Sequence, residues 1–215
     1  MARYQIRKQA LTAVRETVRE NLRTGNAREI ETWTRVIRWS LLLAGVFALI
    51  RFRIGALGAL SVGCWGLFRM RELDGRFLKA ALIGATGVFT VALMCFDPRD
   101  TGYLIYRGLV TAVLVLMMVR YACDAYGRVL AGIDDGLAGK WKKQWRLLRN
   151  TLLVTAIVFL LSIPLGLADL WAISILAGGA MGLFLVFRCW WLLSRTIGSC
   201  RRVLREKMML DSLGQ

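Results

Sequence analysis

The chain has 215 residues, of which 57% are hydrophobic, and 30 Lys and Arg against 14 Asp and Glu give it a net charge of +16 at pH 7. Because this apolar content exceeds the need of one soluble core and the charges are confined to blocks, the composition excludes an ordinary soluble domain and predicts one integral membrane domain. Five cysteines without CxxC spacing and the absence of histidine argue against a disulfide framework and a zinc site, and no cofactor is expected.

Basic residues are segregated along the chain. Of the 30 Lys and Arg, 26 lie in four segments, 1–38, 69–79, 120–149 and 188–215. Between these segments run three apolar stretches, each broken near its middle by a short turn. Short loops rich in Lys and Arg resist translocation, so all four segments belong on the cytoplasmic side. The pattern predicts an all-α integral membrane protein with six transmembrane helices in three repeated hairpins and both termini cytoplasmic.

Residues 1–38 read as a cytoplasmic, amphipathic, basic arm. Its first helix repeats apolar groups three or four residues apart, at Leu11, Val14, Val18 and Leu22. Thr24-Gly25-Asn26 is expected to break this helix, and a second helix leads into the first apolar run. Trp33 and Trp39 suit membrane-interface anchors. A removable signal peptide is not expected, because the apolar run does not follow directly on a short charged start.

Residues 39–193 form the predicted six-helix membrane bundle, and residues 194–215 a basic cytoplasmic tail. The expected hairpin legs are 39–50 and 54–68, then 80–96 and 103–119, then 151–163 and 170–187. Pro98 and Pro164 lie in the second and third outer turns, where proline ends a helix at low cost. The first leg rises only ~18 Å against a hydrocarbon core of ~30 Å, so a re-entrant or interfacial helix is its alternative.

The loop 120–149 carries a second amphipathic pattern. Trp141 and Trp145 share one side of a helix whose other side holds Lys142 and Lys143. This arrangement is typical of a helix lying in the headgroup plane, where it binds anionic membrane lipids. The positive charge could instead indicate nucleic acid, but its distribution is the one that topology demands, so no nucleic-acid partner is expected.

Small residues mark helix packing in the predicted spans. Gly178 and Gly182 form a GxxxG pattern, which lets helix backbones approach closely. We expect packing within one chain, with homo-oligomerisation through the sixth span as the alternative. A transporter coupled to protons or cations normally requires an ionisable group within the membrane. No carboxylate falls inside any of the predicted spans. No P-loop, dinucleotide, HExxH or GxSxG motif is present, so no catalytic residue is predicted.

The hairpins also resemble one another. Gly45-Val46-Phe47-Ala48-Leu49 recurs as Gly87-Val88-Phe89-Thr90-Val91-Ala92-Leu93, and Gly63-Cys64-Trp65-Gly66-Leu67-Phe68 matches Gly179-Ala180-Met181-Gly182-Leu183-Phe184. Over residues 36–193 this plan of glycine-bearing legs and proline-containing outer turns resembles the HdeD-like family of bacterial inner-membrane proteins. The first turn departs from that plan, being basic and without proline, and the arm, the 120–149 loop and the tail are larger than the family requires.

The resemblance implies a role in acid resistance and supplies no catalytic residues. The sequence therefore predicts a non-enzymatic, polytopic membrane protein, acting in envelope or acid-stress tolerance or as a membrane scaffold. The alternative is a transporter or channel subunit, or a component of a larger membrane complex, whose amphipathic segments dock a membrane-protein partner. A third possibility is an intramembrane enzyme acting on lipid, which would need convergent ionisable groups between the spans.

Overall fold

The structure is a computed structural model, and it describes residues 2–96, 101–131, 133–162 and 168–213. Side-chain surroundings are described for residues 24–93, 110–131, 133–151 and 186–212, and for scattered positions from 153 to 184. Within these ranges there are six α-helices, one 3-10 helix and no strand. The helices are α1 (Ala2–Leu49), α2 (Arg53–Arg69), η1 (Met70–Glu72), α3 (Gly75–Phe96), α4 (Thr101–Val129), α5 (Asp135–Ser162) and α6 (Ala168–Leu213).

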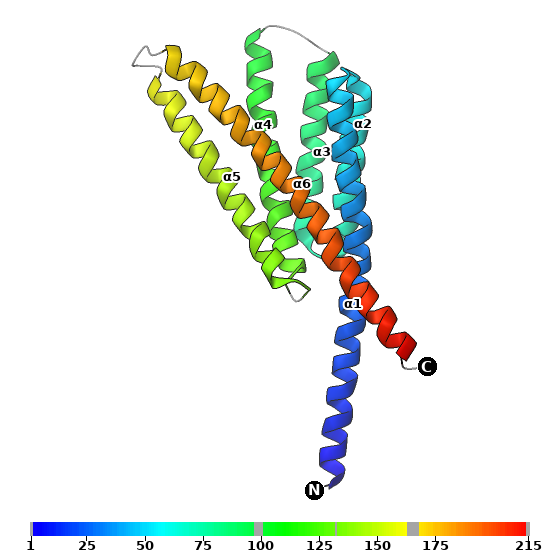
Figure 1. Ribbon diagram of the computed structural model, residues 1–215. Coiled ribbons are helices and arrows are strands. Elements are labelled where there is room, and N and C mark those ends of the chain that lie inside the picture. Colours follow the sequence, from blue (N-terminus) through cyan, green and yellow to red (C-terminus); the bar gives the residue numbers. More distant parts are fainter. Residues whose placement is uncertain (1, 97–100, 132, 163–167, 214–215) are drawn as a thin grey trace.

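The six α-helices form a ring in chain order. Each packs against the next, and α6 returns to pack against α1. The helix ends that flank 50–52, 97–100 and 163–167 lie at the top of Figure 1, and those that flank 70–74 and 130–134 lie at the opposite end of the bundle, near mid-height in the picture. We call the first the apolar end and the second the polar end. The N-terminal part of α1 and the C-terminal part of α6 project beyond the polar end (Figure 1).

The packed core of the described residues sits near the polar end. Every α-helix contributes to it, with Ile30, Leu67, Phe77, Tyr126, Trp141 and Leu192 as members. These residues fall in or beside the basic segments of the sequence rather than in the apolar stretches. Burial of large side chains is the main source of helix-packing free energy in water, so the polar end is built like the core of a water-soluble bundle.

The apolar stretches, by contrast, leave large side chains exposed. Examples from all six α-helices are Leu43, Ile54, Leu82, Phe89, Val113, Val154, Phe184 and Phe187. Two helical segments of the described chain are long and apolar enough to cross a membrane, Gly75–Leu93 in α3 and Val110–Val129 in α4. Only 28% and 22% of their most apolar windows are buried, whereas the core helix of a soluble protein is mostly buried. α2 has 17 residues, slightly fewer than such a span usually contains.

A Schellman motif joins α1 to α2, where the sequence predicts the first outer turn. Arg51 adopts φ 58°, the left-handed conformation. Its N–H donates to the carbonyl of Ala48 over 3.1 Å, and the N–H of Phe52 donates to Phe47 over 2.8 Å. The rings of Phe47 and Phe52 meet edge to face at 5.4 Å, the hydrophobic contact that accompanies this motif. The turn is therefore present at the predicted place, although Arg53 already begins α2.

The predicted break at Thr24-Gly25-Asn26 is wrong, because α1 is continuous from Ala2 to Leu49. Glycine within a helix costs ~1 kcal/mol relative to alanine. That cost is offset by a seam of buried residues that crosses the glycine position and faces the bundle. The seam consists of Thr24, Ala27, Ile30, Thr34, Ile37, Ser40 and Ala44. Its members are three or four residues apart, the spacing of one helix face.

The surface helix predicted in the 120–149 loop is also absent from the described chain. α4 continues to Val129 and α5 begins at Asp135, so only residues 130–134 connect them. Asp134 caps α5, since its Oδ1 accepts the N–H of Leu137 over 2.9 Å and its Oδ2 accepts the hydroxyl of Ser199 over 2.8 Å. These two hydrogen bonds hold the pKa of Asp134 below its ordinary value. The basic segment 140–149 therefore lies along the bundle within α5.

Close helix contacts occur at glycines of α2 and α3. A Cβ placed on Gly63 would lie 2.7 Å from Ser40 Oγ, and one on Gly84 would lie 2.7 Å from Met118 Sδ and 2.9 Å from Cys64 Sγ. These contacts require glycine where α2 meets α1 and where α3 meets α4 and α2. The surroundings of Gly178 and Gly182 lie outside the described side chains, so their packing role stays a prediction.

Two further sequence expectations concern boundaries and repeats. The core takes Ile30 and Ile37 from the predicted arm and Cys200 and Val203 from the predicted tail, so the boundaries at residues 38 and 193 are not limits of packing. Nothing in the structure tests the threefold sequence repeat.

Candidate functional site

Aromatic rings and basic side chains meet where the basic segments join the apolar stretches. Arg69 lies over Trp33 at 5.3 Å, Arg71 over Phe68 at 4.4 Å, Lys79 over Tyr121 at 6.0 Å, Arg38 over Trp190 at 5.1 Å, and Lys140 and Arg195 over Trp191 at 5.5 and 5.0 Å. We call these residues, together with Trp39, the belt. They come from all six α-helices and η1. Each contact joins a cation to a ring face, which is favourable by roughly 0.5–2 kcal/mol.

Arg38 is held between α1 and α6. Its guanidinium lies 5.1 Å from the ring of Trp190 and 5.8 Å from that of Trp39, and its Nη1 donates to Ser194 Oγ over 3.2 Å. The Nε atom is buried and has no acceptor among the described residues. No carboxylate of the described chain pairs with this guanidinium. Arg38 is thus a partly buried cation whose charge is met by ring faces and one neutral hydroxyl.

Two more cations, Lys140 and Arg195, contact Trp191, which is next to Trp190 on α6. The ring is 43% exposed, and both Lys140 of α5 and Arg195 of α6 lie against it. Arg195 is one turn after Trp191, so both project from the same side of the helix. The belt therefore continues across the outer surface from α1, over α6, to α5.

The predicted interface residues fall into two groups. Trp39 is 50% exposed, and Lys142 and Lys143 are exposed, whereas Trp33 and Trp145 are half-buried beside the core. These five side chains lie on or near the surface at the polar half of the bundle. Whether they contact a membrane stays a prediction.

Trp141 is the exception to that group, since it is 3% exposed and belongs to the core. Its indole stacks on Tyr126, and its Nε1 donates to Thr196 Oγ1 over 3.1 Å. The expectation that this indole faces the headgroups is therefore wrong. The amphipathic pattern of α5 is real, but α4 and α6 cover its tryptophan face at this position.

The surroundings of Tyr126 link the remaining helices. Its hydroxyl forms a hydrogen bond with Thr34 Oγ1 over 3.0 Å and donates to Met70 Sδ over 3.9 Å, while Phe77 meets its ring edge to face at 5.1 Å. Because these partners come from α1, η1 and α3, the cluster fixes how those elements sit against α4. Every polar contact here is satisfied inside the protein, which suits packing rather than chemistry.

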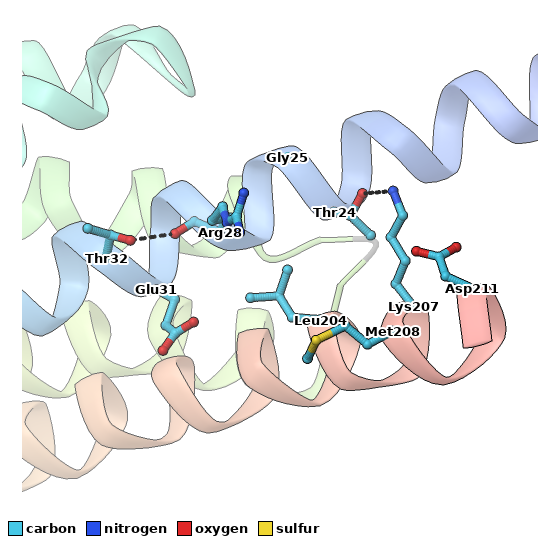
Figure 2. Close-up of a pocket in the computed structure, with 9 residues that line it drawn as sticks. All are labelled: Thr24, Gly25, Arg28, Glu31, Thr32, Leu204, Lys207, Met208 and Asp211. Carbon is cyan, nitrogen blue, oxygen red and sulfur yellow. Dashed lines mark hydrogen bonds between the residues drawn. The ribbon is translucent and has the colours of Figure 1, made fainter.

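An open cleft of about 650 Å³ lies between the projecting parts of α1 and α6. Figure 2 shows its lining, which is Thr24, Gly25, Arg28, Glu31, Thr32, Leu204, Lys207, Met208 and Asp211. The lining mixes two cations with two carboxylates, and apolar side chains of α6 form part of the wall. Lys207 Nζ donates across the cleft to Thr24 Oγ1 over 3.3 Å.

Glu31 carries the ionic contact between α1 and α6. Its Oε1 accepts from Arg201 Nε over 2.8 Å and also from Arg35 Nη2, on the next turn of α1. Burial raises the pKa of Glu31, but hydrogen bonds from Arg201 and Arg35 and their charges outweigh burial, so its pKa falls below the ordinary 4.5. The carboxylate is therefore ionised at neutral pH and acts as a structural anion rather than a proton donor.

Residues that could hold a metal ion do not gather in the described chain, where no three of the His, Cys, Asp and Glu type form a group. Cys64, Cys123, Cys189 and Cys200 are free thiols there, and Cys95 lies outside the described side chains. Sequence reasoning missed Arg38, Trp190 and Trp191. The signal that could have found them is the pair of adjacent tryptophans at the start of the 188–215 basic segment.

Comparison with known proteins adds no assignment: no family model, no curated protein and no solved structure matches this chain.

Proposed function

We propose that this chain is a non-enzymatic, multi-pass protein of the bacterial cytoplasmic membrane, with six spans in three hairpins and its polar end in the cytoplasm. The observation that carries the proposal is the change of surface at the belt. Beyond the belt toward the apolar end, large side chains such as Leu43, Phe89 and Phe187 are exposed. Toward the polar end the core is packed, and the large apolar side chains exposed beyond it among the described residues are on the projecting end of α6, at Met208, Met209 and Leu210.

Lipid accounts for both halves of that surface. Exposed apolar patches larger than a few hundred Å² are rare on soluble monomers, and hydrocarbon chains would cover these side chains at no cost in hydration. Tryptophan and tyrosine concentrate where hydrocarbon meets headgroups, and Lys and Arg are retained on the cytoplasmic side. The belt has both features. Arg51 and Arg53 at the apolar end lie next to a short turn and would reach the outer interface by extending their side chains.

Within this membrane class we propose a scaffold, in envelope or acid-stress tolerance as the HdeD-like resemblance suggests. The support is that all six α-helices meet in one core, while α1 and α6 project beyond it. Such a body offers a rigid platform with two exposed helical ends. No step of a reaction is assigned to any residue.

Two measurements test this proposal. The chain should remain in the membrane fraction after alkaline carbonate extraction, as an integral protein does. Deleting its gene in the native host should lower survival after acid challenge, and the unaltered chain supplied in trans should restore it. Release by carbonate would contradict the membrane assignment. Unchanged survival, in cells shown to express the protein beforehand, would remove the stress role alone.

A second candidate function, a subunit of a transporter, a channel or another membrane complex, is favoured by the cleft between α1 and α6. Its mixed charges and its place beyond the core would suit a helix of a partner protein. A stable, stoichiometric partner should then co-purify, and Lys207→Glu should weaken that association more than Arg205→Glu, which alters an exposed residue outside the cleft. A particle that purifies alone and supports no solute flux in proteoliposomes would argue against this candidate.

A further inference from the structure

We infer that the outer face of α6 at the belt binds the phosphate-bearing headgroup of an anionic phospholipid, between Arg38 on one side and Lys140 and Arg195 on the other. This inference rests on the proposed membrane function and deepens it by naming a lipid site. The cations come from three helices, α1, α5 and α6, that the ring brings together.

Arg38 is the anchor of the site. A guanidinium has five N–H donors, and the described residues accept only the one directed at Ser194. The rings of Trp39 and Trp190 restrict the guanidinium, so little side-chain entropy remains to be lost on binding. A planar donor fork held in place and lacking a carboxylate partner suits the paired oxygens of a phosphate.

The face of α6 that carries the site lies at the surface, where Trp191 and Arg195 are exposed and Trp190 and Ser194 are half-buried. Trp190, Trp191, Ser194 and Arg195 occupy about 140° of the helix circumference at ~100° per residue. The opposite face consists of buried residues, among them Leu192, Thr196 and Cys200. Headgroup contacts made by the first set would therefore not compete with the core.

These cations differ from the other basic residues near them. Arg201 and Arg35 share the carboxylate of Glu31, and Arg76 pairs with Asp124. Among the described residues, no carboxylate forms an ion pair with Arg38 or Arg195. Lys140 is less isolated, because the carboxylate of Asp134 acts on it through its charge. The phosphate of an anionic lipid would compensate the positive charge of these side chains. A zwitterionic headgroup would do so less well, because it carries a cation of its own.

The surface beside the site indicates a lipid rather than free phosphate. Phe187 and Phe184 precede Trp191 by four and seven residues, so they lie one and two turns nearer the apolar end on the same side of α6. Both are exposed, by 72% and 55%. An acyl chain attached to a phosphate at Trp191 would lie along them. Inorganic phosphate would gain nothing from this apolar strip.

The test uses the full chain in nanodiscs that contain phosphatidylcholine with increasing amounts of phosphatidylglycerol, read by quenching of tryptophan fluorescence with brominated phosphatidylglycerol. Quenching by brominated phosphatidylglycerol is compared with quenching by brominated phosphatidylcholine. The unaltered chain should prefer phosphatidylglycerol by about tenfold, the effect of one good charge-assisted hydrogen bond. Arg38→Gln should abolish most of that preference. Arg205→Gln removes the same charge from an exposed position of α6, about 15 Å along the helix from Arg195. This variant should retain the preference for phosphatidylglycerol.

Two further measurements keep the result unambiguous. If Arg38→Gln unfolds, the double variant Lys140→Gln and Arg195→Gln, whose side chains lie outside the core, should show the same loss. Inorganic phosphate at millimolar concentration should not relieve the quenching. Equal quenching by both lipids, equal losses in Arg38→Gln and Arg205→Gln, or displacement by free phosphate would each overturn the lipid site. Failure of the chain to enter either bilayer would instead overturn the proposed function.

Discussion

The ring of Tyr126 in α4 stacks on the indole of Trp141 in α5, with centroids 4.6 Å apart and planes 14° from parallel. Because Trp141 also donates a hydrogen bond to Thr196, this pair joins α4, α5 and α6 at the polar end. Stacked aromatic pairs contribute ~0.5–1.5 kcal/mol beyond the burial of their surface. A tryptophan in a lysine-rich segment is therefore a core residue here.

Replacing Trp141 with alanine should destabilise the protein by about 3–5 kcal/mol, because the change removes a fully packed side chain and leaves a cavity. Thermal unfolding in detergent, followed by circular dichroism, measures the effect. Trp39→Ala is the matched control, since that ring is half exposed, and it should change stability much less. Similar shifts for both variants would mean that Trp141 is not in the core.

Gly84 should tolerate no β-branched side chain. A Cβ at this position meets Met118 Sδ at 2.7 Å and Cys64 Sγ at 2.9 Å, whereas Gly45 has nothing within 4 Å. Overpacking of this kind costs about 1–3 kcal/mol, so Gly84→Val should lower the unfolding temperature. Gly45→Val, also within a helix, should leave it unchanged or raise it slightly. The contact of α3 with α2 and α4 is wrong if the two variants melt alike.

The contact between α1 and α6 should weaken in acid. The pKa of Glu31 is depressed on folding, so its contribution to stability is full above the ordinary value of 4.5 and is lost as pH falls through the folded value. Glu31→Gln should therefore cost about 1 kcal/mol at pH 7 and progressively less below pH 4.5. Unfolding curves of both proteins across this pH range measure the difference. The exposed neighbour Glu29 is the control, and Glu29→Gln should change the unfolding midpoint at pH 7 much less than Glu31→Gln does.

Arg51→Gly should stabilise the turn between α1 and α2. Arg51 holds φ 58°, a conformation that costs an L-residue about 1 kcal/mol and glycine almost nothing. The expected gain is about 1 kcal/mol, read from the midpoint of unfolding. Arg53→Gly is the comparison, because Arg53 begins α2 and should yield no gain. A loss of stability in Arg51→Gly would show that the left-handed turn is not present.

The all-helical fold could be predicted, because apolar stretches of helical length alternate with charged segments. The turn predicted at residues 51–53 is confirmed, and Arg51 adopts the left-handed conformation there. The continuity of α1 could not be predicted, since its seam is filled by Thr24, Thr34 and Ser40. These polar residues keep the spacing of a buried face but lower its hydropathy, so a search for apolar periodicity sees a gap where the helix is continuous.

For the site, the sequence predicts the types of residue involved, tryptophan beside lysine and arginine, but not which of them meet. An amphipathic pattern tells which residues share a face, not whether lipid or another helix covers that face. Trp141 and Trp145 share a stripe, yet α4 and α6 cover the first. Arg38 is assigned to the site because it contacts Trp190 and Ser194, which are more than 150 residues away in the chain. Such long-range contacts leave no local signal.

The most direct test of the whole account is the side of the membrane on which each turn lies. In a cysteine-free background, Glu72→Cys, Ala131→Cys and Arg51→Cys place single thiols at exposed positions of the polar and apolar ends. With a membrane-impermeant maleimide on spheroplasts, we predict labelling at position 51 in intact cells and at 72 and 131 only after lysis. Labelling of positions 72 and 131 from opposite sides would contradict the three-hairpin membrane topology.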